Sequence, residues 1–435
     1  MEKDTLDFCV KKNNLKYPIT KLISFFFLLF YFFLFLYLSY KYIFITKNLF
    51  TFNILNLIVC ALLSIFWLIV LKTQNKTFRL LSVIYYISIL ISLYSWEAWK
   101  NYPQLSFIFE KFDLRTKMQV YKTLSRDQDI VPTISISKSN SNIFPLGGIS
   151  DKITLFCNEN GEFITYKADR YGFRNNDVVW DKKIDTVLLG DSFAHGACVD
   201  KDISYHLSKK VNLVNLAYQG NGPLKMYGSF EEYGKKLKPK YIIWMYDSFN
   251  DLDDLIVENN NYILRKYYDL NFNQKLINKQ RIIDENLNKL VKSEFESISN
   301  RKFSHTIKLY NIRMLIKNLI LNNEKEDKDL EKQFEQFKLI FDQFIKISKQ
   351  INSEIIFVFF SDKDELSKAK IDIMDENVIN FIKSKDLILI NIHEIMKNSR
   401  NYKKYFPFDG SRFGHLNEAG YKLVAKEIEK HLIQD

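Results

Sequence analysis

The apolar positions form long runs in the first hundred residues and much shorter runs afterwards. Three uncharged runs come first: Leu22–Tyr40 with 19 residues, Asn48–Leu71 with 24, and Leu80–Trp96 with 17. A helix needs roughly 17–25 apolar residues to cross a hydrocarbon core. The pattern therefore predicts a membrane anchor over residues 1–100 with three transmembrane helices, at 22–40, 50–71 and 80–96. The serines of the third run leave an interfacial or packed helix open as an alternative.

The chain after residue 100 has the pattern of a connector followed by an α/β domain. Residues 101–150 contain the polar run Thr133–Asn142 and predict a connector. Two strand-like segments, Lys152–Cys157 and Glu162–Tyr166, then flank an Asn-Glu-Asn-Gly turn and predict a hairpin. Short apolar runs alternating with helix-length segments indicate a parallel sheet covered on both faces. The predicted domain spans 151–435, and its strands are Thr186–Leu189, Asn212–Asn215, Tyr241–Tyr246, Ile355–Phe360 and Leu387–Asn391.

One segment of this domain is longer than a strand connection requires. It covers about 252–328 between the third and fourth strands, and it is rich in Asn, Lys and Glu with Ile and Leu at helical spacing. This composition predicts a helical insertion. It serves either as a solvated cap or as a lid that shapes a substrate cleft.

The net charge of +11 would favour nucleic acid or an anionic surface as a partner, but the excess lies beside the apolar runs. Residues 1–100 hold 11 Lys and Arg against 4 Asp and Glu, which leaves 51 against 47 for the rest of the chain. Five basic residues precede the first predicted helix and three lie between the second and third, against two between the first and second. This distribution places the N-terminus in the cytoplasm and the domain outside it. We therefore expect a lipid partner and no nucleic acid.

Two further features bear on the same question. A secretory signal peptide is the rival interpretation of the first run, but 19 uncharged residues exceed a normal signal core and no small-residue cleavage site follows. The predicted domain has two cysteines, Cys157 and Cys198. Sequence alone does not pair them.

The first candidate for chemistry is the sequence Gly190-Asp-Ser-Phe-Ala-His195, which directly follows the first predicted strand. Ligands of open parallel sheets bind beyond the carboxyl ends of the strands. Ser192 therefore lies where a nucleophile is expected, with Asp191 and His195 as candidate substrate contacts. The alternative is that Gly-Asp-Ser is turn chemistry alone.

Three more segments lie at the same predicted edge. Gly220 follows the second strand, and Asn250 and Asp251 follow the third. His415 precedes the last helix, which Asn417 is expected to cap, and Asp409 lies in the loop before it. Each segment alone also fits an ordinary turn or loop. Together they permit a Ser–His–Asp relay.

The four segments, in this order over about Thr186–Leu432, resemble the SGNH (GDSL-like) hydrolase family. The resemblance implies a flavodoxin-like three-layer sandwich with a parallel sheet. It also implies Ser192 as nucleophile and His415 as general base. The oxyanion hole would comprise the N–H groups of Ser192 and Gly220 and the amide of Asn250. No metal or organic cofactor is implied, and no Cys/His cluster has metal-ligand spacing.

One position departs from the family pattern. The family has Asp three residues before the His, and here that residue is Arg412. The carboxylate then comes from Asp409, which we favour, or is replaced by a backbone carbonyl in a Ser–His dyad, or the relay is degraded. Arg412 itself is a candidate contact for an anionic substrate group, as Asp251 is for other substrate atoms.

The resulting expectation is a membrane-anchored serine esterase. Its substrate would be an O-acyl group, most simply O-acetyl, on a carbohydrate or cell-envelope polymer. One alternative is an O-acetyltransferase for an exported polysaccharide, working with a membrane acyl-transfer protein as partner. Another is a non-catalytic envelope protein with a degraded site.

Overall fold

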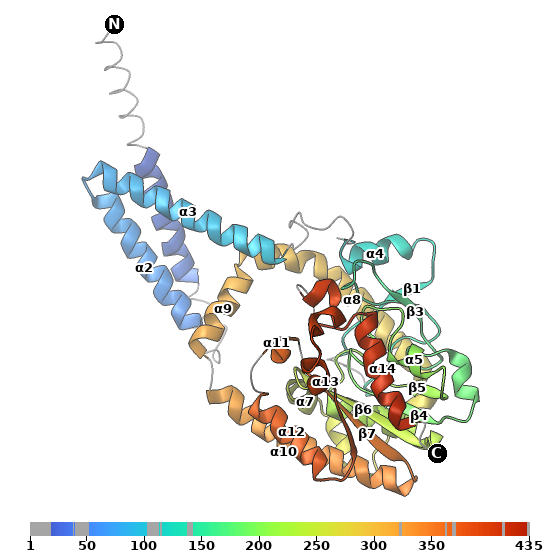
Figure 1. The fold of residues 1–435 in the computed structure, drawn as a ribbon. Helices are drawn as coiled ribbons and strands as arrows, with labels where there is room; N and C mark the ends of the chain where they lie inside the picture. Colours follow the sequence, from blue (N-terminus) through green and yellow to red (C-terminus); the bar gives the residue numbers. More distant parts are fainter. Residues whose placement is uncertain are drawn as a thin grey trace. The chain divides into compact units, whose positions relative to one another are not determined.

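The computed structural model describes residues 19–37, 39, 52–101, 113, 115–136, 142–321, 324–361, 363–367, 371–410 and 414–432. The chain divides into two compact units. The first comprises residues 1–106 and 300–322, and the second comprises residues 107–299 and 323–435. Figure 1 shows the elements of both units, which are described separately below.

The first unit contains the apolar helices. They are Ile19–Tyr37, α2 (Phe52–Lys72) and α3 (Lys76–Asn101). Among the described residues, Ile19–Tyr37 and Lys76–Ala98 are long and apolar enough to cross a membrane, whereas the segment Ile58–Lys72 of α2 is shorter. Two of the three predicted spans thus have the necessary length and composition, and a crossing by α2 stays a prediction.

The three helices pack through aromatic side chains. Trp67 of α2 is fully buried, and its ring stacks on Phe27 at 4.9 Å and meets Tyr86 of α3 edge-on at 5.0 Å. The outward surface is equally apolar, because large side chains such as Leu22, Leu62 and Ile91 are exposed. A surface of this kind is typical of helices that contact lipid.

The predicted insertion is helical and belongs to both units. It begins with α7 (Asp251–Asn259) and continues through α8 (Gln280–Ile307), α9 (Tyr310–Leu321) and the first residues of α10 (Glu324–Gln350). In the first unit, α9 packs on α3 through the buried carboxylate of Glu97. Its two oxygens accept hydrogen bonds from the N–H groups of Asn311 at 2.9 Å and Ile312 at 3.1 Å. Glu97 therefore satisfies N–H groups that the first turn of a helix leaves free.

The second unit is built on a parallel sheet of five strands. They are β4 (Thr186–Leu189), β5 (Leu213–Asn215), β6 (Tyr241–Asp247), β7 (Glu354–Phe360) and β8 (Ile388–Asn391). Their order across the sheet is β5-β4-β6-β7-β8, which is the flavodoxin-like order. All seven residues of β6 are buried. The predicted α/β class and the predicted parallel sheet are therefore confirmed.

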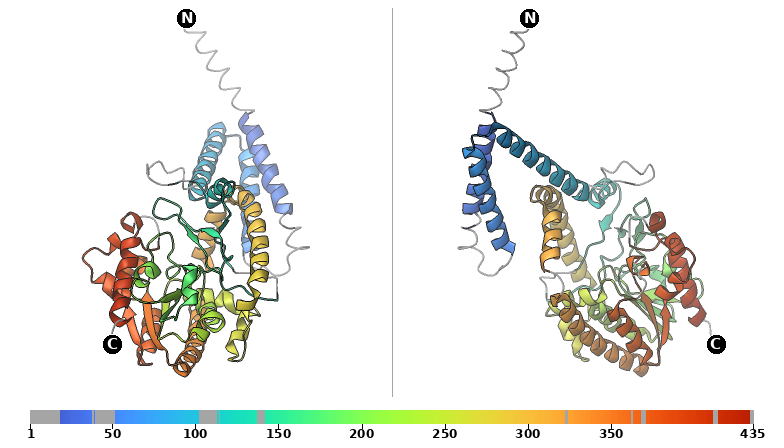
Figure 2. Two further views of the ribbon diagram at one scale, coloured as in Figure 1. Left: turned by 90° about the vertical axis from the view of Figure 1, so that its right-hand side faces the viewer. Right: turned by 60° about the vertical axis from the view of Figure 1, so that its left-hand side comes forward.

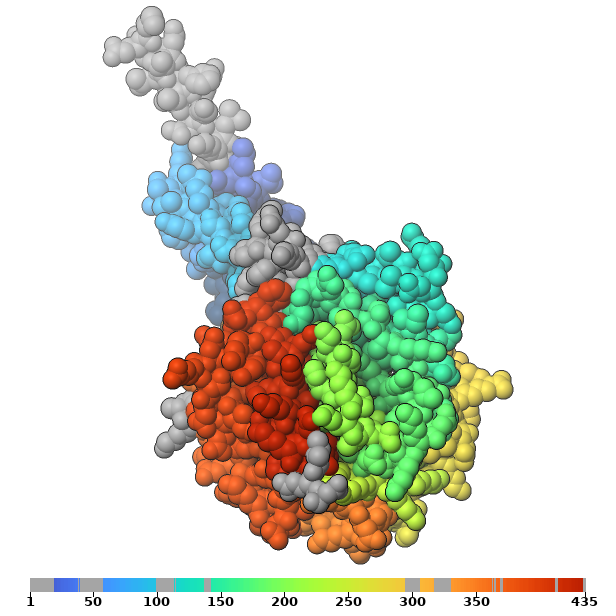
Figure 3. All heavy atoms as spheres, turned by 45° about the vertical axis from the view of Figure 1, so that its right-hand side comes forward, coloured from blue at the N-terminus to red at the C-terminus, as the bar shows by residue number. Residues whose placement is uncertain are grey.

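Helices cover both faces of this sheet. Successive side chains of each strand point to opposite faces, so neighbouring residues of one strand pack against different helices. Leu188 and Ile243 belong to one apolar cluster with α5 (Ile203–Leu207), α13 (Ile392–Lys397) and α14 (Glu418–Leu432). Val187 and Trp244, their neighbours in sequence, belong to the other cluster with α6 (Pro223–Ser229), α10 and α12 (Ile373–Lys383). Figures 1 and 2 show α14 and α10 on opposite sides of the strands. Figure 3 shows α14 beside the segment of α5.

A small second sheet precedes the parallel one. It consists of β1 (Ile130–Pro132), β2 (Ile153–Leu155) and β3 (Thr165–Lys167), and β2 pairs with β3 in antiparallel register. The predicted hairpin is thus present, and the Asn158 side chain closes its turn by accepting a hydrogen bond from the Gly161 N–H at 2.9 Å. The segment predicted as a connector also contains α4 (Lys117–Leu124) and β1. The remaining short helices are η2 (Asp177–Asp181), η3 (Phe230–Gly234), η4 (Lys235–Leu237), η5 (Leu264–Tyr268), η6 (Leu276–Lys279), α11 (Lys363–Leu366), η7 (Tyr402–Tyr405) and η8 (Pro407–Gly410).

Candidate active site

Ser192 lies in a tight turn directly after β4, at the carboxyl edge of the parallel sheet. Gly190 permits this turn, because a Cβ added to it would lie 2.5 Å from the Cβ of Ala194. The N–H of His195 donates to the carbonyl oxygen of Asp191 at 2.9 Å, and the N–H of Ala197 donates to that of Ser192 at 3.0 Å. The turn therefore holds the Ser192 hydroxyl at the position that the sequence predicts for a nucleophile.

His415 lies beside this hydroxyl, although it belongs to the C-terminal end of the domain in sequence. Its Nε2 lies 2.9 Å from Ser192 Oγ, across 223 residues of sequence. Asn417 fixes the loop that carries the imidazole, because its amide donates to the carbonyl oxygens of Lys404 at 2.8 Å and Phe406 at 3.0 Å. The Asn417 side chain also accepts a hydrogen bond from the Gly420 N–H at 3.0 Å. It therefore caps α14, as predicted.

The carboxylate beside the imidazole is Glu159 and not the predicted Asp409. Glu159 Oε1 lies 2.7 Å from His415 Nδ1, and the two side chains are 17% and 25% exposed. An imidazole offers one Nδ1, so this contact occupies the place assigned to Asp409. Asp409 is exposed instead, and it lies in a left-handed turn with φ of 52°. Glu159 comes from the turn of the β2–β3 hairpin.

The nucleophile also contacts the Asp191 carboxylate. Ser192 Oγ lies 3.1 Å from Asp191 Oδ2, while Asp191 Oδ1 accepts a hydrogen bond from the Phe193 N–H at 2.9 Å. Burial raises the pKa of Asp191, and the nearby His415 opposes this shift. Asp191 is 1% exposed, so its contacts are with the nucleophile turn. The predicted substrate contact at this residue is not accessible.

Two residues of the predicted oxyanion hole lie on separate elements. Asn250 is the N-cap residue directly before α7, and its amide donates to Asp191 Oδ2 at 3.4 Å, which brings it beside the nucleophile turn. Gly220 has φ of 72°, and its carbonyl oxygen accepts a hydrogen bond from Lys225 Nζ at 2.5 Å. The Glu258 carboxylate supports the same loop by accepting hydrogen bonds from two backbone N–H groups, those of Gly222 at 2.7 Å and Leu224 at 2.9 Å.

His195 is a buried packing residue and not a substrate contact. Its ring is fully buried and lies against Phe156 and Tyr218, with ring centroids 4.4 and 5.0 Å apart. Nδ1 accepts a hydrogen bond from the Gln219 N–H at 3.2 Å, and Nε2 lies 2.9 Å from the Tyr166 hydroxyl. Burial lowers the pKa of His195 well below its ordinary value, so the ring is neutral.

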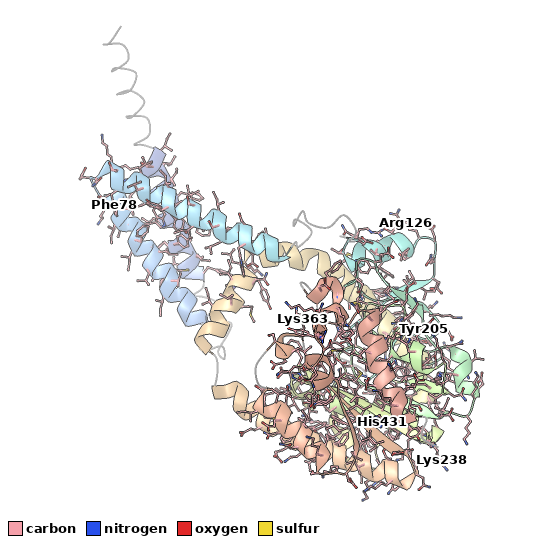
Figure 4. All side chains as sticks on the ribbon, viewed as in Figure 1. Phe78, Arg126, Tyr205, Lys238, Lys363 and His431 are labelled. Atoms are coloured by element: carbon pink, nitrogen blue, oxygen red, sulfur yellow. A yellow bond between two sulfur atoms is a disulfide. The ribbon has the colours of Figure 1, made fainter. Side chains whose placement is uncertain are left out.

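Asp251, another predicted substrate contact, is likewise inaccessible to a substrate. It is fully buried, and its Oδ2 accepts a hydrogen bond from the Asp247 N–H at 3.2 Å. Burial and the nearby Asp191 carboxylate raise the pKa of Asp251 well above its ordinary value. Arg412, the other predicted substrate contact, lies outside the described residues. Near that segment, Lys363 of α11, labelled in Figure 4, donates to the carbonyl oxygen of Gly410.

One group of potential metal ligands occurs among the described residues, at the same place. It comprises Glu159, Cys198 and His415, whose ligand atoms lie within 4.8 Å of one another. Cys198 is joined to Cys157 in a disulfide, so its sulfur is not a thiolate. The thiolate is the form of cysteine that binds metal. The group is therefore better described as a His–Glu pair beside a disulfide.

Comparisons with known proteins add little to this geometry. No family model matches the chain, and no curated protein matches it. Among solved structures, the chain is similar to an acetyl xylan esterase, AlAXEase, with 10% sequence identity and a TM-score of 0.32. The match covers 57% of this chain and 100% of that one. At this level the likeness carries no argument about function.

Proposed function

We propose that the protein is a membrane-anchored serine esterase of the SGNH (GDSL-like) type. The observation that carries the proposal is the hydrogen-bonded series Ser192–His415–Glu159 at the carboxyl edge of a parallel sheet. A nucleophile within 3 Å of a base, and a base oriented by a carboxylate, are the elements of a catalytic triad. The four sequence segments that resemble the family supply the rest of the site.

The chemistry follows from the positions of these groups. His415 Nε2 takes the Ser192 proton as Oγ attacks the ester carbonyl carbon, and the carbonyl oxygen becomes an oxyanion. Glu159 accepts the Nδ1 proton in a hydrogen bond, which holds the imidazole in the correct tautomer and stabilises its protonated form. His415 then protonates the leaving alcohol, and an acyl-enzyme remains. Water attacks this ester with His415 again as base, which releases the acid and restores Ser192.

The oxyanion would accept hydrogen bonds from three donors, namely the N–H groups of Ser192 and Gly220 and the amide of Asn250. Asn250 supports this assignment because its amide already reaches Asp191 Oδ2, one residue from the nucleophile. Such donors act strongly because they are oriented before the charge develops.

A non-catalytic protein is the weaker alternative. Its main support was Arg412, which replaces the expected Asp and suggested a degraded relay. Glu159 offers a carboxylate at His415 from another loop, which supports a complete relay. The disulfide Cys157–Cys198 further supports an extracytoplasmic domain, because disulfides persist mainly in oxidising compartments. An O-acetyl group on an envelope carbohydrate is the substrate that we favour.

The test uses the full-length protein in detergent micelles with p-nitrophenyl acetate as substrate. We expect Ser192→Ala and His415→Ala each to lower kcat by ~10³-fold or more, with no further loss in the double variant, because the two residues act as one unit. Ser208→Ala is the matched control, since Ser208 is an exposed serine of the same domain. Turnover that both active-site variants retain would exclude the proposed esterase.

A further inference from the structure

We infer that the Cys157–Cys198 disulfide, together with Asn160, positions the Glu159 carboxylate, so that catalysis depends on the oxidised state of this cysteine pair. The inference rests on the proposed function. Cys157 lies two residues before Glu159, and Cys198 lies six residues after Ser192. The disulfide therefore links covalently the turn that carries the carboxylate to the segment that carries the nucleophile.

Asn160 provides a second link on the other side of Glu159. Its amide donates to the carbonyl oxygen of Cys198 at 3.0 Å. The residues on both sides of Glu159 are thus attached to the same residue of the nucleophile segment. The Glu159 side chain between them has little freedom to leave His415.

The strands of the hairpin also contact the nucleophile segment, because the Phe156 ring lies 4.4 Å from the His195 ring and the Tyr166 hydroxyl lies 2.9 Å from His195 Nε2. These contacts lie on the strand side of the turn and do not involve Glu159 or Asn160. The strands β2 and β3 have only three residues each.

The Asn158 side chain shapes the turn by accepting a hydrogen bond from the Gly161 N–H at 2.9 Å, and it donates one to the carbonyl oxygen of Asp113 at 3.0 Å. Neither of these two hydrogen bonds involves the nucleophile segment. They preserve the shape of the turn without fixing its distance from His415.

The backbone conformation of Cys198 also depends on restraint by the disulfide. Cys198 is fully buried, and its φ of 60° is a left-handed conformation that residues with a Cβ adopt at a cost. It packs with Phe156 and Ala197 in a small apolar cluster of its own. Opening the disulfide removes the covalent restraint on a backbone that disfavours this conformation. We expect Cys198, Asn160 and Glu159 to relax together.

The redox step is an ordinary thiol–disulfide exchange. A dithiol reductant attacks one sulfur as a thiolate, which gives a mixed disulfide, and its second thiol displaces the protein sulfur. Two electrons and two protons pass to Cys157 and Cys198, and the reductant leaves as a cyclic disulfide. The covalent link between the turn that carries Glu159 and the nucleophile segment is then lost.

A double-mutant cycle tests whether the disulfide acts through Glu159. The full-length protein in detergent micelles is assayed with p-nitrophenyl acetate as wild type, Cys157→Ser/Cys198→Ser, Glu159→Gln and the combination. We expect the cysteine changes to lower kcat by roughly tenfold or more in the wild type, with KM nearly unchanged. In the Glu159→Gln background they should lower it by less than about twofold. An equal loss in both backgrounds would overturn the inference, because it would show a general effect on the fold.

Reversible reduction tests the inference without a cysteine substitution, so it still applies if the cysteine variant does not fold. Wild type treated with a dithiol should lose activity and regain it on reoxidation. Glu159→Gln, whose activity is already lowered, should lose little of its remaining activity on reduction. Cys60→Ser is the control, because Cys60 is the free cysteine among the described residues and should not alter the response. Full activity in protein whose two thiols are shown to be alkylated after reduction would contradict the inference.

A readout independent of turnover separates this inference from the esterase proposal. In ¹⁵N-histidine-labelled protein, the Nδ1–H···Glu159 hydrogen bond gives the His415 ring a distinct proton resonance. Reduction and Glu159→Gln should both remove it, even in the inactive Ser192→Ala protein. If Ser192→Ala leaves turnover intact, the proposed function fails, and the resonance still decides the inference. A resonance unchanged by reduction would show that the disulfide does not position Glu159.

Discussion

Glu159 Oε1 lies 2.7 Å from His415 Nδ1, although 256 residues of sequence separate the two. Glu159→Gln keeps the size of the side chain but replaces the ionised acceptor that stabilises a protonated imidazole. We expect kcat for p-nitrophenyl acetate to fall by ~10²–10⁴-fold with little change in KM. Steady-state kinetics of the full-length protein measures this.

Asp409→Asn is the matched control for that change, because Asp409 is exposed and was the residue that the sequence favoured. We expect its kcat to stay within about twofold of wild type, as is usual for surface substitutions. A large loss in Asp409→Asn combined with normal turnover in Glu159→Gln would refute the assignment of the carboxylate.

The oxyanion role of Asn250 makes a separate prediction. Asn250→Asp preserves the shape of the side chain and removes its only N–H donors, and it adds a charge beside the buried Asp191 carboxylate. Asn250→Ala removes the donor alone. We expect Asn250→Ala to lower kcat by ~10²-fold, as for loss of one oxyanion donor, and Asn250→Asp to lower it further. The comparison of kcat and KM in the two variants measures the effect.

Asn259→Ala serves as a control for this pair, because Asn259 lies at the other end of α7 and bonds to Gln333 and Tyr268. It should change stability without changing kcat. Wild-type kcat in Asn250→Ala would remove Asn250 from the oxyanion hole and leave the backbone donors.

The sequence predicted the parallel sheet well because its signal is local. Buried parallel strands are continuous apolar runs, so the predicted strand Thr186–Leu189 matches β4 and the predicted Tyr241–Tyr246 is one residue shorter than β6. The positions of Ser192 and His415 followed from the same logic, since the carboxyl ends of parallel strands share an edge. Their contact at 2.9 Å is the outcome expected for the family resemblance.

Glu159 was missed because its position depends on tertiary structure. In sequence it is the second residue of Asn-Glu-Asn-Gly, which is fully explained as a turn. The hairpin itself was predicted, but the place of its turn against His415 depends on the disulfide and on the hydrogen bond from Asn160 to Cys198, which join it to a distant segment. The one available signal was Cys157, since a disulfide to Cys198 would bring the turn next to the nucleophile segment, but the sequence alone does not pair these cysteines.

Glu97 predicts a local effect on stability in the first unit. In Glu97→Ala the N–H groups of Asn311 and Ile312 lose their acceptor, which typically costs about 1 kcal/mol at a helix N-terminus. We expect limited proteolysis within 300–322 to become roughly fivefold faster, because local opening governs cleavage there. Glu285→Ala is the control, since Glu285 is an exposed glutamate of α8 paired with Arg281. Equal cleavage rates in Glu97→Ala and wild type would show that the carboxylate does not hold α9.

The pKa of Glu258, whose carboxylate supports the loop that contains Gly220, determines how stability should depend on pH. Burial raises the pKa of Glu258 from its ordinary 4.5 to about 7, although Lys225 and two backbone N–H groups lower it. The folded state therefore keeps a proton that the unfolded state releases, so the free energy of unfolding should fall as the pH rises from about 4.5 to about 7. Chemical denaturation followed by Trp fluorescence should show a smaller difference between mildly acidic and mildly alkaline buffer in Glu258→Gln than in wild type. An unchanged difference would mean that Glu258 is ionised in the folded protein throughout this range.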